Sequence, residues 1–330
     1  MSLTCAISQD YDNFSLDVNF SVGRETLGIL GASGSGKTTI LRAVAGILRP
    51  NRGRIVADDV VFQDGSTFLP PRKRHVGMLF QHYALFPEMT ILENITLCLS
   101  GNRREKRQRA MELLGLFHLE NQAHQKPGEL SGGQRQRAAL ARMMSTDPRL
   151  LLLDEPFSAL DVHLRQEMMG LMKEVLEDFS GSAILVSHNP EEVARLCDRV
   201  LIVDEGEAVE EGEVGELFQG AKTLAGARLL GLGNVIEHRE DLALLGMDGA
   251  GALLLEEKKQ AGRPIDVLVE DVVVSGRKSL VYGRLPGGSA VRLRLEGAPK
   301  PGEVLPWFVN RENLRPLVKN VRKKSHHEGF

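Results

Sequence analysis

Residues 31–38 have the types and spacing of a phosphate-binding loop. They read Gly-Ala-Ser-Gly-Ser-Gly-Lys-Thr, which fits GxxxxGK followed by Ser or Thr, between a predicted buried strand and a predicted helix. Glycines allow successive backbone N–H groups to point at phosphate oxygens, and the helix N-terminus adds a positive dipole end. Lys37 would reach the β- and γ-phosphates, and the Thr38 hydroxyl would bind Mg²⁺. The loop predicts a bound nucleoside triphosphate, with contacts from Gly31, Ser33, Gly34, Ser35, Gly36, Lys37, Thr38 and Thr39.

Two carboxylates follow the apolar run Leu150–Leu153. Asp154 and Glu155 stand at the carboxyl end of this predicted buried strand, where the ligands of parallel sheets gather. Asp154 would hold Mg²⁺ through water, and Glu155 is placed to orient or deprotonate the water that attacks the γ-phosphate. A solvated pair of strand-end acids is the structural alternative, and the presence of the phosphate-binding loop disfavours it.

The segment Leu130-Ser131-Gly132-Gly133-Gln134 stands between these two motifs. A phosphate-binding loop alone is shared by kinases, GTPases and helicases, so it does not select a function. Ser131 and the glycines precede a helical run, Arg135–Met143, and their hydroxyl, N–H groups and helix dipole would form a second anion site. An ordinary serine N-cap explains Ser131 but not the paired glycines, which weaken the start of a helix.

The order of these motifs resembles the ATP-binding cassette ATPases of ABC transporters over residues 1 to about 230. Gln81, Ser158-Ala-Leu-Asp161 and His188 complete the resemblance. It implies a head-to-tail pair of cassettes, with each ATP between the phosphate loop of one copy and residues 131–134 of the other. The resemblance also implies that Gln81 contacts Mg²⁺ and the attacking water, that His188 senses the γ-phosphate, and that Asp161 links the two sites. The implied residues are catalytic Glu155, His188 and Gln81, metal-binding Thr38, Gln81 and Asp154, and nucleotide-contacting Ser131, Gly132, Gly133, Gln134 and Asp161.

An adenine ring needs an aromatic or apolar partner, and in this family an aromatic residue near the first strand stacks on it. Tyr11 is the candidate here, and Phe14 is its rival. Stacking discriminates little between bases, so the preference for ATP over GTP rests on the resemblance. ATP and Mg²⁺ are therefore the expected cofactors.

The elements that must position these residues are those of an α/β P-loop ATPase core with a mixed sheet. Alternating apolar residues predict a half-buried strand over 14–20, and a continuous apolar run predicts a buried one over 26–30. Helical spacing with many charges, broken at 126–133, predicts a helical insertion over about 93–145. The other expected elements are a helix over 37–48 and strands over 55–62, 76–80, 150–153 and 183–186.

After Gly231 helical periodicity fades, and short strand-like runs separated by turns follow. The runs lie at 265–269, 272–274, 280–284 and 291–295. Their spacing favours a small C-terminal β-rich domain, an OB-like barrel or a sandwich, with Trp307 in its core. The expected organisation is an ATPase domain over 1–231, a β-rich regulatory domain over 232–320 and a disordered tail over 321–330.

Composition narrows the setting of this chain of 330 residues. The 41 Lys and Arg residues against 44 Asp and Glu residues give a net charge of -3, which disfavours general nucleic-acid binding. The three cysteines form no CxxC pair, which fits a reducing cytoplasm. No apolar stretch approaches the roughly 20 residues that span a bilayer, and the first residues lack the plan of a signal peptide. The resemblance to ABC transporter ATPases adds the expectation of a protein at the cytoplasmic face of the inner membrane, peripheral through a permease.

The step from ATP hydrolysis to transport rests on resemblance. Residues 81–94 are similar to the region of importer cassettes that receives the coupling helix of the permease. Four apolar residues there belong either to that interface or to the core under the helical insertion: Tyr83, Leu85, Phe86 and Met89. The expected partners are a second copy of the chain, membrane permease subunits and, indirectly, an external solute-binding protein, with no nucleic acid.

One cassette followed by a β-rich tail is similar to importers of minerals and organic ions. Residues 13–20 and 60–75 look most like molybdate import ATPases, with ferric-iron, polyamine and sulfate importers close behind. The tail departs from the molybdate pattern, because it has no Ser-Ala-Arg-Asn-like segment. The expected function is ATP-driven uptake of a small ion, with a molybdate- or tungstate-type oxyanion favoured.

Two other classes share the phosphate-site residues. A soluble ABC ATPase of DNA repair or translation would be expected to carry a long coiled-coil insertion, a tandem cassette or a net basic charge, and the sequence has none of these. A phosphoryl-transfer kinase would not need residues 130–134 or a dimer-facing Asp161.

Overall fold

The computed structural model describes residues 2–80, 84–158, 160–247, 251–254, 263–275, 278–309 and 314–318. The chain divides into two compact units, within residues 1–208 and 209–325, and each unit has its own hydrophobic core. Gln81, Tyr83 and the expected tail at 321–330 lie outside the described residues.

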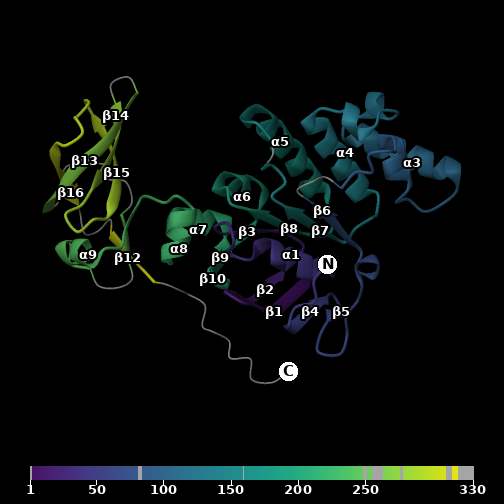
Figure 1. Ribbon diagram of the computed structural model, residues 1–330, viewed down its shortest axis with the longest axis horizontal. Coiled ribbons are helices and arrows are strands. Elements are labelled where there is room, and N and C mark those ends of the chain that lie inside the picture. Colours follow the sequence, from purple (N-terminus) through teal and green to yellow (C-terminus); the bar gives the residue numbers. More distant parts are fainter. Residues whose placement is uncertain are drawn as a thin grey trace. The chain divides into compact units, whose positions relative to one another are not determined.

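A ten-stranded mixed sheet organises the first unit (Figure 1). Its strand order is β5-β4-β1-β2-β10-β9-β3-β8-β7-β6, with parallel pairing among β9, β3, β8, β7 and β6 and antiparallel pairing among β1, β2, β4 and β5. The strands are β1 (Leu3–Tyr11), β2 (Phe14–Val22), β3 (Thr26–Leu30), β4 (Arg52–Ala57), β5 (Val60–Gln63), β6 (Val76–Leu79), β7 (Leu150–Asp154), β8 (Ser182–Ser187), β9 (Arg199–Asp204) and β10 (Glu207–Glu213).

The burial of these strands follows their sequence patterns. Every residue of β3, β7 and β8 is buried, as expected for parallel strands with both faces covered. In β2 buried residues alternate with exposed ones, so the predicted half-buried strand is confirmed. Helix α1 (Lys37–Ala45) is shorter than the expected 37–48, because Gly46 adopts a left-handed conformation with φ 78° and closes the helix.

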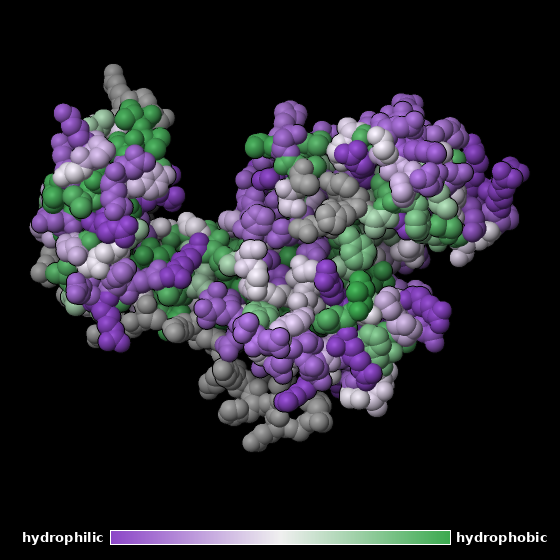
Figure 2. All heavy atoms as spheres, viewed as in Figure 1, coloured by the Kyte–Doolittle hydropathy of each residue, from purple (hydrophilic) through white to green (hydrophobic). Residues whose placement is uncertain are grey.

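Three helices form the predicted insertion: α2 (Ile91–Thr96), α3 (Arg103–Leu116) and α4 (Gly132–Met144). Helix α3 begins with a capping box between Asn102 and Glu105, and hydrophilic side chains cover the region of α3 in Figure 2. Helix α4 begins three residues before the predicted Arg135. The expectation placed both glycines outside the helix, whereas the Ser131 cap draws them into its first turn.

Two further helices cover the parallel strands, α5 (Val162–Asp178) after β7 and α6 (Pro190–Leu196) after β8. Gly28 of β3 allows α6 to pack closely, because a Cβ at this position would lie 2.7 Å from a methyl carbon of Val193. The described residues of this unit also form three short 3-10 helices, η1 (Pro71–Lys73), η2 (Glu120–Gln122) and η3 (Pro127–Glu129).

The described strands of the second unit form two antiparallel sheets, ordered β11-β12-β17 and β15-β14-β13-β16. Its elements are α7 (Val214–Gly220), α8 (Leu224–Leu229), β11 (Asn234–Ile236), α9 (Arg239–Leu245), β12 (Gly251–Leu254), β13 (Arg263–Ser275), β14 (Lys278–Arg284), β15 (Ala290–Glu296), β16 (Val304–Val309) and β17 (Leu314–Leu317).

Three details of the second unit differ from the sequence expectation or refine it. The runs predicted at 265–269 and 272–274 are one strand, β13, whose pairing with β14 shifts register between Val269 and Asp271. Helix α9 was not expected, because its buried face holds only two apolar residues, Leu242 and Leu245, beside buried Asp241. Trp307 packs against the core, as predicted, but is half-buried.

Candidate functional site

The predicted phosphate-binding loop joins β3 to α1. Gly34 and Gly36 have φ of 82° and 99°, in the left-handed region that favours glycine. Gly31 is required for a different reason, because a Cβ there would lie 2.4 Å from the carbonyl oxygen of Val203 in β9. The sequence therefore folds this loop tightly over the carboxyl ends of the parallel strands.

Lys37 is buried at the first position of α1, without a carboxylate within ion-pair distance in the described residues. Its ammonium group donates hydrogen bonds to the carbonyl oxygens of Gly31 and Ala32, both at 2.8 Å. Burial lowers the pKa of Lys37, and the charges of Glu155 and Asp154 oppose that shift. A cation held only by neutral carbonyls, at a helix N-terminus, is well suited to exchange them for phosphate oxygens.

The residues that would hold Mg²⁺ meet at the end of β7. The Thr38 hydroxyl donates a hydrogen bond of 3.1 Å to the carboxylate of Asp154, which is buried. Burial raises the pKa of Asp154, the Thr38 hydrogen bond opposes the shift, and Glu155 reinforces it. The hydroxyl and the neighbouring carboxylate, which has little positive charge near it, are both hard oxygen ligands. Mg²⁺ prefers such ligands, so these residues fit it. Gln81, the third predicted ligand, lies outside the described residues.

Glu155 and His188 are brought together from the ends of β7 and β8. Nδ1 of His188 lies 3.3 Å from a carboxylate oxygen of Glu155. The Glu155 backbone has a left-handed φ of 46°, and its N–H donates to the carbonyl of Val186 at 3.0 Å. A non-glycine residue held in this region turns its side chain away from the strand direction, and such strain is common at functional sites. The pairing of these two predicted catalytic residues is therefore built into the backbone.

One cavity of about 350 Å³ is lined by half of the predicted nucleotide contacts. Its lining consists of Tyr11, Phe14, Ser33, Gly34, Gly36, Lys37, Thr38, Thr39 and Glu155. Gly31 and Ser35 lie in the same loop outside this lining, and the Ser35 hydroxyl is buried without a hydrogen-bond partner among the described residues. A buried hydroxyl of this kind is a donor that a bound phosphate could satisfy.

Both candidate aromatic residues line the cavity, at the tip of the β1–β2 hairpin. The rings of Tyr11 and Phe14 are tilted by 33°, with centroids 6.2 Å apart. Tyr11 is 47% exposed, whereas Phe14 packs against the core and beside Gly36. Tyr11 thus has the free ring face that a base would need.

The other predicted nucleotide contacts lie outside this cavity. Ser131 and Gln134 form a capping box at the start of α4, with hydrogen bonds of 2.9 and 3.3 Å. Gly132 has open space around it, and a Cβ on Gly133 would meet Leu164 at 2.6 Å. Asp161 caps α5 through a 3.0 Å hydrogen bond from the N–H of Leu164. Within one chain neither Asp161 nor residues 131–134 line the cavity of Lys37.

Gln136 is a candidate site residue that the motifs of the sequence do not indicate. This fully buried side chain of α4 donates a 2.5 Å hydrogen bond to the carbonyl of Pro156, the residue after Glu155. It links the helix of residues 131–134 to the end of β7. Its one sequence signal is a polar residue on the apolar face of a predicted helix.

Buried Asn94 of α2 fixes the backbone of residues 86–90. Its amide donates to the carbonyls of Phe86, Met89 and Thr90 and accepts from the N–H of Phe86, at 2.8 to 3.2 Å. Phe86 is 41% exposed, while Leu85 and Met89 are half-buried. The guanidinium of Arg142 lies 4.3 Å from the centroid of the Phe86 ring. The segment thus presents a preformed, partly apolar surface.

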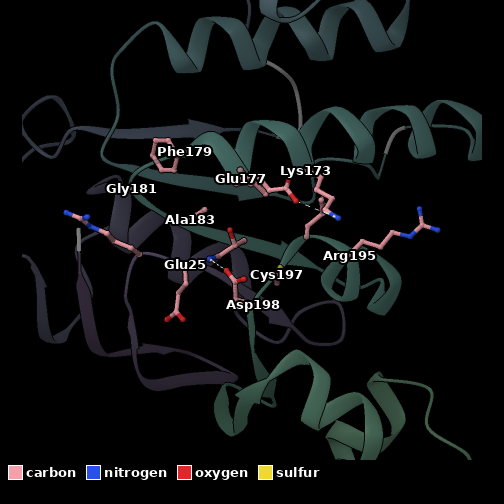
Figure 3. A pocket seen from close by; sticks show the side chains of 13 residues that line it. Glu25, Lys173, Glu177, Phe179, Gly181, Ala183, Arg195, Cys197 and Asp198 are labelled. Atoms are coloured by element: carbon pink, nitrogen blue, oxygen red, sulfur yellow. Dashed lines mark hydrogen bonds and ion pairs between the residues drawn. The ribbon is translucent and has the colours of Figure 1, made fainter.

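A second pocket, of about 320 Å³, lies at the amino ends of β3, β8 and β9 (Figure 3). Its charged residues are largely paired. Lys173 lies 3.7 Å from Glu177, and Asp198 accepts the N–H of Thr26 at 2.8 Å. Burial raises the pKa of the Cys197 thiol and so disfavours its ionisation. This opposite edge of the sheet holds none of the predicted site residues.

Comparison with known proteins finds a family model and curated relatives that match this chain. The model of the ABC transporter family matches residues 12–158. The molybdate/tungstate import ATP-binding protein WtpC of Pyrococcus horikoshii is 38% identical, over 94% of this chain and 92% of the relative. The spermidine/putrescine import ATP-binding protein PotA of Vibrio cholerae is 37% identical, over 83% of this chain and 77% of the relative.

A solved structure is similar in fold. The dimeric post-hydrolysis state of the ATP-binding cassette MJ0796, bound to ADP and Pi, gives a TM-score of 0.57 at 29% sequence identity. The match covers 65% of this chain and 99% of the solved chain.

Proposed function

Because the chain belongs to the ABC transporter family of ATP-binding cassettes, we propose that it is the ATP-hydrolysing subunit of an importer for a small ion. The chain is an ATPase that uses ATP and Mg²⁺. The observation that carries the proposal is the convergence of Lys37, the Thr38–Asp154 pair and the Glu155–His188 pair at the carboxyl edge of one sheet.

The roles of the site residues follow from their positions. Lys37 exchanges the carbonyls of Gly31 and Ala32 for β- and γ-phosphate oxygens. Thr38 and Asp154 would hold Mg²⁺, which when bound would neutralise phosphate charge. Glu155 orients the attacking water and accepts its proton, while His188 steadies the Glu155 carboxylate from 3.3 Å and reaches toward the γ-phosphate.

The active form proposed is a pair of chains. Residues 131–134 and Asp161 lie outside the cavity of their own Lys37, so a second copy must bring them to the nucleotide. The dimeric state of the ADP-bound cassette MJ0796 supports this arrangement. Ser131, the glycine N–H groups and the α4 dipole then contact the γ-phosphate from the partner side.

The permease contact is assigned to residues 84–90. Phe86 is exposed on a loop that Asn94 holds in shape, which suits a surface that receives a helix from another subunit. Within the described ranges, no helix is both long and apolar enough to cross a membrane. Docking on permease subunits would place the chain at the cytoplasmic face of the membrane, with ATP-driven dimer closure moving the permease.

The favoured cargo is a molybdate- or tungstate-type oxyanion. The relative named for molybdate and tungstate import matches 94% of this chain, whereas the polyamine relative matches 83%. Polyamine import is the second candidate, since its relative is almost equally identical. We assign a regulatory role to the β-rich region at 232–320.

The experiment that tests the proposal is a pull-down of the tagged full-length chain from gently solubilised native membranes, with ATPase activity recorded. Recovery of a permease and a solute receptor supports an importer, and the receptor is then titrated with molybdate, tungstate, sulfate, ferric iron and spermidine. Micromolar or tighter binding of molybdate or tungstate alone supports the favoured cargo, and binding of spermidine alone replaces it. Repeated recovery of soluble partners only would overturn the importer proposal.

A further inference from the structure

Glu192 of α6 is a buried carboxylate directly behind His188. The residue is 5% exposed, and burial raises its pKa against the opposing effects of Ser187, Arg165 and His188. Burying an ionisable group costs free energy unless neighbouring groups pair with it or hydrogen-bond to it. Two segments around Glu192 supply such groups.

The first segment is the turn that carries His188. The Ser187 hydroxyl donates a 2.6 Å hydrogen bond to one carboxylate oxygen of Glu192, and the Asn189 amide approaches the other at 3.4 Å. Ser187 also accepts the N–H of Asn189 at 2.9 Å. Both neighbours of His188 are therefore tied to one carboxylate, so the position of Glu192 sets the position of the His188 backbone.

The second segment carries Asp161. Arg165, one turn into α5, donates from Nη2 to the carbonyl of Leu160 at 3.3 Å. Its Nε lies 4.0 Å from the carboxylate of Glu192 and is buried without a hydrogen-bond partner in the described part of the chain. The pair is thus at ion-pair distance but one short displacement from a direct hydrogen bond.

We propose that Arg165 and Glu192 are positioning residues that couple the segment around Asp161 to His188. The path runs from the Leu160 carbonyl through the Arg165 guanidinium to the Glu192 carboxylate, and from there to Ser187 and Asn189 on either side of His188. The inference rests on the proposed function, in which Asp161 faces the second copy of the chain. Arrival of that copy draws Arg165 onto Glu192, and the Glu192 carboxylate then fixes His188 against Glu155.

A matched control exists on the same two helices. Gln166 of α5 accepts a hydrogen bond of 2.6 Å from Arg195 of α6 on the exposed side of this helix pair. This contact joins α5 to α6 as the Arg165–Glu192 pair does, but in the described structure it bonds neither Leu160 nor Ser187. It therefore separates a specific path from general packing of the two helices.

The test is steady-state ATP hydrolysis by the full-length chain with Arg165→Met, Glu192→Gln and both together. Each single change is expected to lower kcat about tenfold while the KM for ATP and the melting temperature stay near wild type. The double variant should lose no more than either single variant, because both break one path. Arg165→Lys should recover part of kcat, and Gln166→Ala should leave it unchanged.

Three results would overturn the proposal: a wild-type kcat in both single variants, losses that multiply in the double variant, or an equal loss in Gln166→Ala. If Arg165→Met does not fold, Arg165→Lys and Glu192→Gln complete the cycle. Failure of the underlying function looks different, because Glu155→Gln would then retain ATPase activity. A dead Glu155→Gln variant beside fully active Arg165 and Glu192 variants removes the coupling path alone.

Discussion

Charged side chains have different partners at the two edges of the parallel strands in the first unit. At the carboxyl edge, Lys37 bonds only neutral carbonyls, and Asp154 has a pKa raised by burial. At the amino edge, Glu25 lies 2.7 Å from Arg199, and Asp198 accepts a backbone N–H. At the amino edge these charged side chains thus have partners within the protein. At the carboxyl edge, within the described residues, Lys37 lacks a charged partner, which a bound ligand would supply.

The largest expected contrast between the edges is catalytic. Glu155→Gln should lower the ATPase kcat by at least about a hundredfold, because the amide cannot accept the proton of the attacking water. Binding of ATP should persist, and an ATP-dependent dimer should appear in size-exclusion chromatography. Glu25→Gln at the amino edge should stay within about twofold of wild type. Normal turnover in Glu155→Gln would remove Glu155 from catalysis.

The next contrast concerns ATP affinity. Lys37→Ala should weaken ATP binding about 10- to 100-fold, the usual worth of a hydrogen-bonded charge, without lowering the melting temperature. Lys173→Ala should leave the affinity for ATP unchanged. Lys173 pairs with Glu177 in the pocket at the amino edge, away from the nucleotide cavity. Calorimetric titration with ATP measures the affinity of both variants. Equal affinities would show that the two edges do not differ in ATP binding.

The smallest contrast is one of stability, and it has opposite signs at the two edges. Asp154→Asn should raise the free energy of unfolding of the nucleotide-free chain at pH 7 by about 0.5–2 kcal/mol. Asp198→Asn should lower it by about 1 kcal/mol, because a charge-assisted hydrogen bond from Thr26 becomes a neutral one.

The pH dependence of the Asp154 effect follows from its raised pKa. The folded chain binds this proton more tightly than the unfolded chain, whose value is near 3.8, so stability falls as pH rises through the folded pKa. The gain from Asp154→Asn should therefore shrink as the pH is lowered toward 3.8. Urea unfolding across this range checks it, and a gain that grows toward acid would contradict the assignment.

Much of the carboxyl edge was predictable because its chemistry is local in sequence. The loop at 31–38 and the pair Asp154–Glu155 each lie within one turn of a buried strand, so spacing alone placed them. Arg165 and Glu192 were not predictable, since their approach depends on the packing of α5 against α6. The sequence pattern did not predict helix α9, because its apolar face is short. It did not predict a continuous β13, because Asp271 interrupts the apolar alternation.

Asn94 holds the backbone of the 86–90 loop, so the exposed side chains of the loop can vary. The buried Asn94 amide accepts one hydrogen bond from the loop backbone and donates to three of its carbonyls, so the exposed residues Phe86, Pro87 and Glu88 do not carry the shape of the loop. Under the proposed permease contact, substitutions at these three positions would change recognition of the other subunit while the ATP chemistry stays intact. For an engineer, the loop is accordingly a graft site, in which surface residues from another cassette can be transplanted onto a frame that Asn94 preserves.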